Sequence, residues 1–282
     1  MLLYSESYYP NDLTLLQSKP TLVFLHGLLG SGQDWRLVID YLSPYYPCLA
    51  IDLPGHSQSQ CVTVTDFEQA NAAITETLLH RGVTEYVLIG YSLGARLAMY
   101  HAVAAFSNEP DFTVEHAAVV NNTETMLNNQ PKLKGLVIEG GHFGLPQTER
   151  ATRFANDEKW AHRFAHEPMH QVLTDWYQQA VFSSLDHDQR QGLITKRSDN
   201  LGSAVAAMMM ATSLSKQPEL LPELQKLTVP HCYIYGEHDE KFKGLAQASA
   251  LDNIAVVGAG HNVHIERPQA FSGCVEEFVK RC

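Results

Sequence analysis

The sequence lacks the features that mark membrane proteins, exported proteins and nucleic-acid-binding proteins. Nowhere do 18 apolar residues follow one another, and residues 1–11 contain no basic start followed by an apolar stretch, so we expect neither a membrane span nor an export signal. No basic run occurs, and 20 Lys and Arg residues against 31 Asp and Glu residues give a net charge of −11. Because nucleic acid and anionic lipid are bound by clustered basic side chains, neither is an expected partner.

Cysteine is also scarce, since the five cysteines are an odd number and form no C-x-x-C pair. The pattern favours reduced thiols, and we therefore expect a cytoplasmic protein, which we take to be a monomer. What the sequence does have is 282 residues with 45% hydrophobic and 18% charged side chains. That composition is typical of a globular chain with one large domain, or with one domain that carries an insertion.

Short apolar runs alternate with helical patterns, which predicts an α/β fold with a mostly parallel central sheet flanked by helices. Six parallel strands are expected at 21–27, 47–52, 86–90, 136–141, 231–236 and 254–258. Helical patterns lie at 34–42, 66–79, 93–105, 241–250 and 268–280.

The alternation stops between residues 142 and 222, where the sequence favours helices without strands. We interpret 142–222 as a helical cap inserted between two parts of the core, 1–141 and 223–282. A second irregularity, 106–131, is rich in Asn and has four acidic residues but no Lys or Arg. We interpret it as a mobile surface excursion without a catalytic role.

The segment G-Y-S-L-G at 90–94 lies directly after a predicted strand and directly before a predicted helix, as in a nucleophile elbow. The chemistry needs small residues on both sides of Ser92, because a sharp strand-to-helix turn leaves no room for side chains there. The turn also sets the Ser92 hydroxyl at the positive end of the helix. The alternative is an ordinary glycine-rich turn.

A serine needs an activating histidine and an orienting carboxylate, and in this fold they follow later strands in the order Ser, Asp or Glu, His. His261 follows the strand at 254–258 and is the expected general base. Asp239 follows the strand at 231–236 and is the expected orienting residue, with Glu237 as its competitor.

An oxyanion hole needs two backbone N–H donors aimed at one point. We expect one from Leu93, which follows Ser92, and the other from Leu28 in the loop after the strand at 21–25. The preceding His26-Gly27 pair is otherwise a plain strand-to-loop turn. The segment 52–57, D-L-P-G-H-S, is interpreted as a signature of the fold and not as a reagent.

The segment 166–170, H-E-P-M-H, matches the letters of the zinc motif H-E-x-x-H. That motif requires a continuous helix, and Pro168 should break or start one. We therefore expect no metal site.

Arginines are concentrated in the predicted cap, which holds five of the ten in the chain, at 150, 153, 163, 190 and 197. Arg96 follows Ser92 by one helical turn. Because arginine binds carboxylates in a bidentate manner, the group suggests a small anionic substrate, although a solvated helix face is the alternative for any one of them. Trp176 and Tyr177 either form a wall of the pocket or pack inside the cap.

These residues resemble those of the α/β-hydrolase superfamily. Seven segments, in this order, narrow the resemblance: V-F-L-H-G, I-D-L-P-G-H, G-Y-S-L-G-A-R, V-I-E-G-G-H-F-G-L, D-W-Y-Q-Q-A-V-F-S-S-L, A-T-S-L-S-K-Q-P and A-G-H-N-V-H-I-E-R-P. Over nearly the whole chain they are similar to the 2-succinyl-6-hydroxy-2,4-cyclohexadiene-1-carboxylate (SHCHC) synthases of menaquinone biosynthesis. The excursion at 106–131 is longer than the corresponding link in the family. This departure puts the surface contacts of the protein in doubt, but it does not affect the expected chemistry.

The resemblance implies a lyase that removes pyruvate from 2-succinyl-5-enolpyruvyl-6-hydroxy-3-cyclohexene-1-carboxylate without a metal or an organic cofactor. It implies that Ser92, deprotonated through His261 and Asp239, takes the proton alpha to the succinyl ketone while the Leu28 and Leu93 N–H groups hold the enolate oxygen. The residues that match substrate-binding positions of the family are Tyr91, Arg96, Arg153, Trp176, Tyr177 and Arg197.

Two other functions stay open from the sequence. A serine hydrolase acting on esters, thioesters or carbon–carbon bonds of a small anionic substrate would use the same three residues. A catalytically silent binding protein is disfavoured, because Ser92, Asp239 and His261 are all present.

Overall fold

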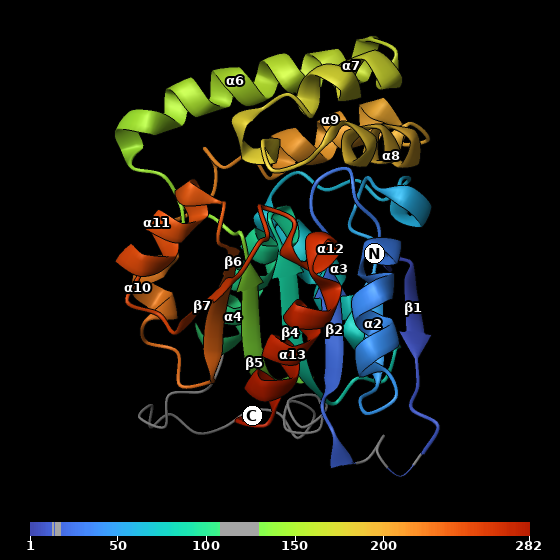
Figure 1. The fold of residues 1–282 in the computed structure, drawn as a ribbon, viewed down its shortest axis with the longest axis vertical. Coiled ribbons are helices and arrows are strands. Elements are labelled where there is room, and N and C mark those ends of the chain that lie inside the picture. Colours follow the sequence, from blue (N-terminus) through green and yellow to red (C-terminus); the bar gives the residue numbers. More distant parts are fainter. Residues whose placement is uncertain (13, 15–17, 108–129) are drawn as a thin grey trace, which may run out of the picture.

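The computed structural model describes residues 1–12, 14, 18–107 and 130–282. Its centre is a seven-stranded sheet in the order β1-β3-β2-β4-β5-β6-β7 (Figure 1). The strands are β1 (Ser5–Tyr8), β2 (Thr21–Leu25), β3 (Cys48–Ile51), β4 (Glu85–Tyr91), β5 (Lys132–Glu139), β6 (His231–Gly236) and β7 (Asn253–Val256).

All six predicted parallel strands are present, from β2 to β7, and the predicted fold class is confirmed. The sequence analysis missed β1, which pairs antiparallel with β3 at the edge of the sheet. Its four residues, S-E-S-Y, are mostly half-buried and form no apolar run, so nothing in the sequence separates this strand from a loop.

Helices cover both faces of the sheet (Figure 1). On one face, α2 (Arg36–Leu42) and α13 (Pro268–Val279) pack over Leu22 and Phe24 of β2. On the other, α3 (Phe67–His80) and α4 (Leu93–Ser107) pack over Val23 and Leu25, because successive side chains of a strand point to opposite faces. The helix α11 (Glu240–Ala248) lies along β6 and β7.

Helices also fill the chain between β5 and β6, and most of them form a layer over the carboxyl ends of the strands (Figure 1). The layer contains α6 (Gln147–His166), α7 (Met169–Trp176), α8 (His187–Arg197) and α9 (Gly202–Ala211), and α10 (Leu221–Leu224) follows beside the sheet. The layer has a hydrophobic cluster of its own, which includes Phe164, Leu173 and Val205. The domain boundaries themselves stay a prediction.

Short elements complete the fold: η1 (Gly32–Trp35), η2 (Ser57–Ser59), η3 (Ala180–Phe182) and α12 (Val263–Glu266). Most of the excursion predicted at 106–131 lies outside the described residues. Within the part that is described, no helix is long and apolar enough to span a membrane. The break predicted at Pro168 is present, because α6 ends at His166 and α7 begins at Met169.

Candidate active site

Ser92 lies in the sharp turn between β4 and α4, with a backbone φ of 50°. Side chains with a Cβ rarely adopt this left-handed conformation, so the surrounding structure must hold it in place. A Cβ at Gly90 would overlap the carbonyl oxygen of Gly94, and a Cβ at Gly94 would overlap the carbonyl oxygen of Leu25. The sequence therefore needs glycine on both sides, as the predicted nucleophile elbow requires.

Asp239 and His261 meet beside this turn. The Asp239 Oδ2 atom lies 2.7 Å from the His261 Nδ1 atom, and the two residues are only 8% and 5% exposed. An Nδ1–H that donates to the carboxylate leaves Nε2 of the imidazole as an acceptor, which is the tautomer that a general base needs. The competitor Glu237 is exposed and accepts instead from the Gly258 N–H, at 2.9 Å.

Two residues that the sequence analysis did not assign fix the His261 ring. Phe242 stacks on it with ring centroids 4.7 Å apart. Gly140, at φ 58°, lies so close that a Cβ there would be 2.8 Å from the His261 Cε1 atom. Gly140 belongs to the E-G-G-H segment, which the sequence analysis used only as evidence of a family resemblance. That resemblance assigned no role to Gly140.

The loop that carries Leu28 lies against the nucleophile turn, since a Cβ on Gly27 would be 3.5 Å from the Ser92 Cβ. Leu93 is the first residue of α4, where N–H groups have no partner inside the helix. Both predicted N–H donors thus belong to segments that adjoin Ser92. Their role as an oxyanion hole stays a prediction.

Two buried histidines hold the Leu28 loop. His56 accepts from the Leu29 N–H at 3.0 Å through Nε2, and His26 accepts from the Leu53 N–H at 2.9 Å in the same way. Burial lowers the pKa of His26 to about 4 and that of His56 to about 3, so both stay neutral. The sequence analysis took these residues for a plain turn and a fold signature, and it missed their function of positioning the loop.

Arg96 extends toward the segment after α9. It donates to Gln217 Oε1 at 2.6 Å and to the Thr212 carbonyl oxygen, and its guanidinium lies 5.3 Å from the centroid of the Phe67 ring. All of these partners are neutral. Desolvation lowers the pKa of Arg96, and the positive charge of Arg153 lowers it further.

Arg153 lies on α6 and holds a carboxylate of the chain. Its Nε atom is 2.8 Å from Asp157 Oδ1, and Asp157 Oδ2 accepts from the Ser213 hydroxyl at 2.7 Å. Asp157 is 3% exposed, so its carboxylate is shielded from water, whereas the Arg153 side chain is 34% exposed. The pair fixes the orientation of the Arg153 guanidinium.

Arg197, at the end of α8, also holds a carboxylate. Its Nη2 atom lies 2.6 Å from Asp34 Oδ2, and Lys196 reaches Asp34 Oδ1 at 2.8 Å. These two cations hold the pKa of the Asp34 carboxyl well below its usual range, against the opposing effect of burial. Arg197 Nε is buried without a hydrogen-bond partner among the described residues, and the Tyr177 hydroxyl and Asp34 raise the Arg197 pKa.

The three predicted aromatic residues differ in their surroundings. The Tyr91 ring lies between two histidine rings, 5.2 Å from His261 and 4.7 Å from His264. Tyr177 is buried and its pKa is raised, first by desolvation. Trp176 is partly buried and packs edge-on against Trp160 at 5.0 Å, beside the cap cluster, so its role as a wall of the pocket stays a prediction.

A second carboxylate–histidine pair lies under the nucleophile turn and was not predicted. Glu139 at the end of β5 is fully buried, and its carboxylate oxygens both lie 2.9 Å from His264 Nδ1. The Glu139 carbonyl oxygen accepts from the Ser92 N–H at 2.8 Å. The ring of His264 stacks on Trp35 at 4.1 Å. The Glu139–His264 pair therefore helps to hold the turn around Ser92 in place.

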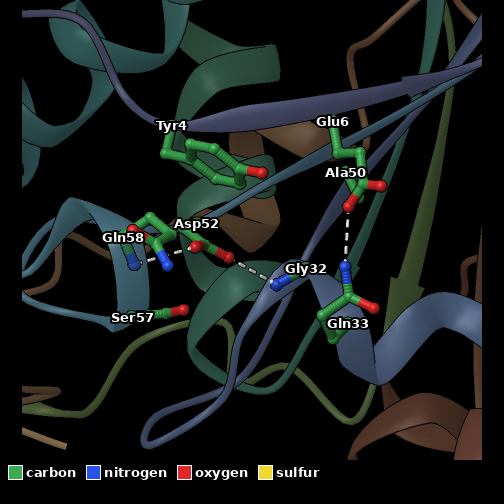
Figure 2. A pocket seen from close by; sticks show the side chains of 8 residues that line it. All are labelled: Tyr4, Glu6, Gly32, Gln33, Ala50, Asp52, Ser57 and Gln58. Atoms are coloured by element: carbon green, nitrogen blue, oxygen red, sulfur yellow. Dashed lines mark hydrogen bonds between the residues drawn. The ribbon is translucent and has the colours of Figure 1, made fainter.

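A small pocket lies beside the carboxyl end of β3, and Asp52 and Gln58 are among its polar lining residues (Figure 2). Its Asp52 carboxylate accepts from the Gly32 and Gln58 N–H groups, at 2.7 and 3.1 Å, so this acid holds backbone and none of the predicted site residues lines the pocket. The described residues contain no group of three or more His, Cys, Asp or Glu side chains that could hold a metal ion.

Fold and site together define a member of a large enzyme class, and comparison with known sequences agrees. The profile of the alpha/beta hydrolase family matches residues 22–273. The chain is 45% identical over 274 residues to the SHCHC synthase of Yersinia enterocolitica, which covers 97% of this chain and 91% of the relative. It is 46% identical over 263 residues to that of Yersinia pseudotuberculosis, covering 93% and 88%.

Solved structures support the same fold. MenH from S. aureus superimposes with a TM-score of 0.82 at 23% identity, covering 99% of this chain and 98% of that one. A thermophilic esterase from Thermogutta terrifontis superimposes with a TM-score of 0.74 at 17% identity, covering 99% and 93%. The chain belongs to the alpha/beta hydrolase family and, within it, to the SHCHC synthases.

Proposed function

We propose that the protein is a lyase that eliminates pyruvate from 2-succinyl-5-enolpyruvyl-6-hydroxy-3-cyclohexene-1-carboxylate to give SHCHC, a step of menaquinone biosynthesis. The observation that carries the proposal is the 45% identity to a curated SHCHC synthase over 97% of the chain, cap and core alike. The residues of the site provide the chemistry that this reaction needs.

The first step is proton abstraction. Asp239 accepts from His261 Nδ1–H, so Nε2 takes the Ser92 hydroxyl proton and the serine oxygen becomes a base. That oxygen removes the proton alpha to the succinyl ketone. The left-handed backbone of Ser92 is typical of a nucleophile elbow, a turn that exposes the serine oxygen at the carboxyl end of the sheet, where the cap lies (Figure 1).

The second step moves the electron pair left by the proton. It forms an enolate, whose oxygen is held by the N–H groups of Leu28 and Leu93, and then passes through the ring double bond to the carbon that carries the enolpyruvyl group. The carbon–oxygen bond of that group breaks, and pyruvate leaves as its enolate and takes up a proton. No acyl-enzyme forms in this series of steps.

The substrate carries three carboxylates, and we propose that Arg96, Arg153 and Arg197 bind them. Tyr91, Trp176 and Tyr177 complete the pocket as walls. We further propose, from the sequence prediction, that the enzyme works as a monomer in the cytoplasm; gel filtration and fractionation of cells test these two points.

The decisive experiment mixes the purified enzyme with the authentic intermediate while pyruvate release and the absorbance of the diene are followed. We expect equal amounts of both products, a primary isotope effect when the alpha proton is deuterium, and no acyl adduct by intact mass. Fast turnover of p-nitrophenyl esters through an adduct on Ser92, without pyruvate release, would instead establish the serine hydrolase.

A further inference from the structure

The cations around the candidate site differ in whether they already hold a carboxylate of the chain. Arg153 and Arg197 each hold one, and Arg96 is bound by neutral groups. Lys241 makes no ion pair with any carboxylate in the described ranges of the chain. It is therefore a cation without a direct carboxylate partner, although the charges of Asp239 and Glu149 act on it, and the sequence analysis did not single it out.

The position of Lys241 follows from the fold. It is the second residue of α11 and comes two residues after Asp239, whose carboxylate accepts from the Phe242 N–H at the start of that helix. The Lys241 Nζ atom lies 5.3 Å from the centroid of the Phe242 ring, and this ring stacks on His261. The ammonium group thus adjoins the ring that covers the expected general base.

The immediate surroundings of Lys241 disfavour a positive charge. The first turn of a helix carries a partial positive charge, which repels a cation. Desolvation of the ammonium lowers the pKa of Lys241, and the charge of Arg153 on helix α6 lowers it further, against the opposing effect of the Asp239 and Glu149 carboxylates. Figure 1 shows the start of α6 above α11. The residue nevertheless lies at the surface, where a ligand can reach it.

An incoming carboxylate would reverse these effects, because it would pair directly with Lys241, as neither Asp239 nor Glu149 does, and would also relieve the repulsion between Lys241 and Arg153. The neighbouring His142 is no competitor for an anion. Desolvation, and then the charge of Lys241, lower the pKa of His142 to about 4, which keeps that imidazole neutral.

We propose that Lys241 binds a carboxylate of the substrate from the core side of the pocket, opposite Arg153, and so helps to place the substrate over Ser92. The inference rests on the proposed function. It adds one cation of the core, Lys241, to the arginines of the cap that are proposed to bind the substrate. Lys241 acts in substrate binding and not in proton transfer.

The test compares Lys241→Gln with Lys243→Gln, a matched control on the same helix that pairs with Glu240 at 3.2 Å. Loss of a charge-assisted hydrogen bond is expected to raise KM for the authentic intermediate about 10- to 100-fold, with kcat within about twofold of the unmodified enzyme. Lys243→Gln should change neither. Lys241→Arg should restore most of the affinity, because it keeps the charge.

Ionic strength gives a readout that a purely structural role would not affect. The kcat/KM of the unmodified enzyme should fall more steeply with added KCl than that of Lys241→Gln, since one attractive charge is missing in the variant. Unchanged thermal unfolding of both variants shows that they are folded.

Three results would overturn the inference. An unchanged KM in Lys241→Gln would show that the ammonium does not touch the substrate. A loss confined to kcat would mean that Lys241 acts through Phe242 on His261. Absence of pyruvate release by the unmodified enzyme would refute the proposed function together with this inference. Because the unmodified enzyme is measured first, this outcome is distinguished from a failure of the inference alone.

Discussion

Replacing His56 tests whether the two buried histidines position the expected oxyanion hole. His56 is fully buried, donates through Nδ1 to the Pro54 carbonyl oxygen at 2.9 Å and accepts from the Leu29 N–H at 3.0 Å. Leu29 itself has φ 67°, a left-handed conformation that needs outside support. In His56→Leu the side-chain volume is nearly kept, but the Leu29 N–H loses its acceptor.

Two magnitudes follow for His56→Leu at pH 7. A buried N–H without a partner costs about 1–3 kcal/mol, so the free energy of unfolding should fall by that amount. Removing one donor of an oxyanion hole lowers kcat by about 100- to 1,000-fold. Because the Leu28 N–H is displaced and not removed, we expect a loss of about 10- to 100-fold in kcat and a much smaller change in KM.

The pH dependence gives an independent magnitude. Burial lowers the pKa of His56 to about 3 in the folded state, whereas an exposed histidine in the unfolded chain titrates near pH 6.5. Between these values the unfolded state binds more protons, so stability is complete above about pH 6.5 and declines as the pH falls. From pH 6.5 to pH 5 the loss is about 2 kcal/mol, at about 1.4 kcal/mol per unit. His56→Leu lacks this loss, so the stability gap between the two proteins should narrow by about 2 kcal/mol.

Urea unfolding followed by tryptophan fluorescence at pH 7, 6 and 5 measures the stabilities, and pyruvate release measures kcat. His101→Leu is the control: His101 is buried on α4 and has its pKa lowered to about 4, but it bonds to Tyr86 of β4 and Asn71 of α3 and to none of the predicted site residues. It should lose stability with an unchanged kcat. An unchanged kcat in His56→Leu would refute the link to the oxyanion hole, and a stability gap that stays constant with pH would refute the protonation argument.

Three shorter predictions concern the same site. Ser92→Ala should lower kcat by about 1,000-fold or more with unchanged thermal unfolding, and retention of over half the activity would refute the assignment. Gly140→Ala brings a Cβ to 2.8 Å from His261 Cε1 at φ 58°, so kcat should fall by about 100-fold with a stability loss of about 1–3 kcal/mol by urea unfolding; wild-type kcat would show that the ring moves freely. Arg96→Met should cost about 2–4 kcal/mol in kcat/KM, whereas the exposed Arg281→Met should cost nothing measurable, and equal effects would place the pocket elsewhere.

The parts of the fold that the sequence predicts well are those set by local physics. A short apolar run such as 22–25, rich in β-formers and followed by glycine, favours a strand buried on both faces, and β2 is that strand. The turn around Ser92 is equally local, because its steric demand falls on Gly90 and Gly94 within the same short segment. The order of Asp239 and His261 after their strands then follows from the parallel topology.

Other features escaped the sequence because their partners are distant in the chain. His26 and His56 accept from N–H groups 27 residues away, and no pattern within one segment reveals such a bond. Glu139 and His264, separated by 125 residues, are equally invisible. The edge strand β1 is too short and too exposed for its alternation to differ from that of a loop.

The number of arginines in the cap does not show which of them are already paired with a carboxylate of the chain. The concentration of arginines in the cap predicts an anionic substrate, but it treats every arginine as free to bind one. Arg197 and Asp34 are 163 residues apart in the chain, yet they form a buried pair that ties α8 to η1. A guanidinium buried without a counter-charge would cost several kcal/mol, so Asp34 stabilises this buried cation. The same carboxylate orients Arg197 and weakens its net attraction for an anion, so we expect cations without such a partner, among them Arg96 and Lys241, to contribute more of that attraction.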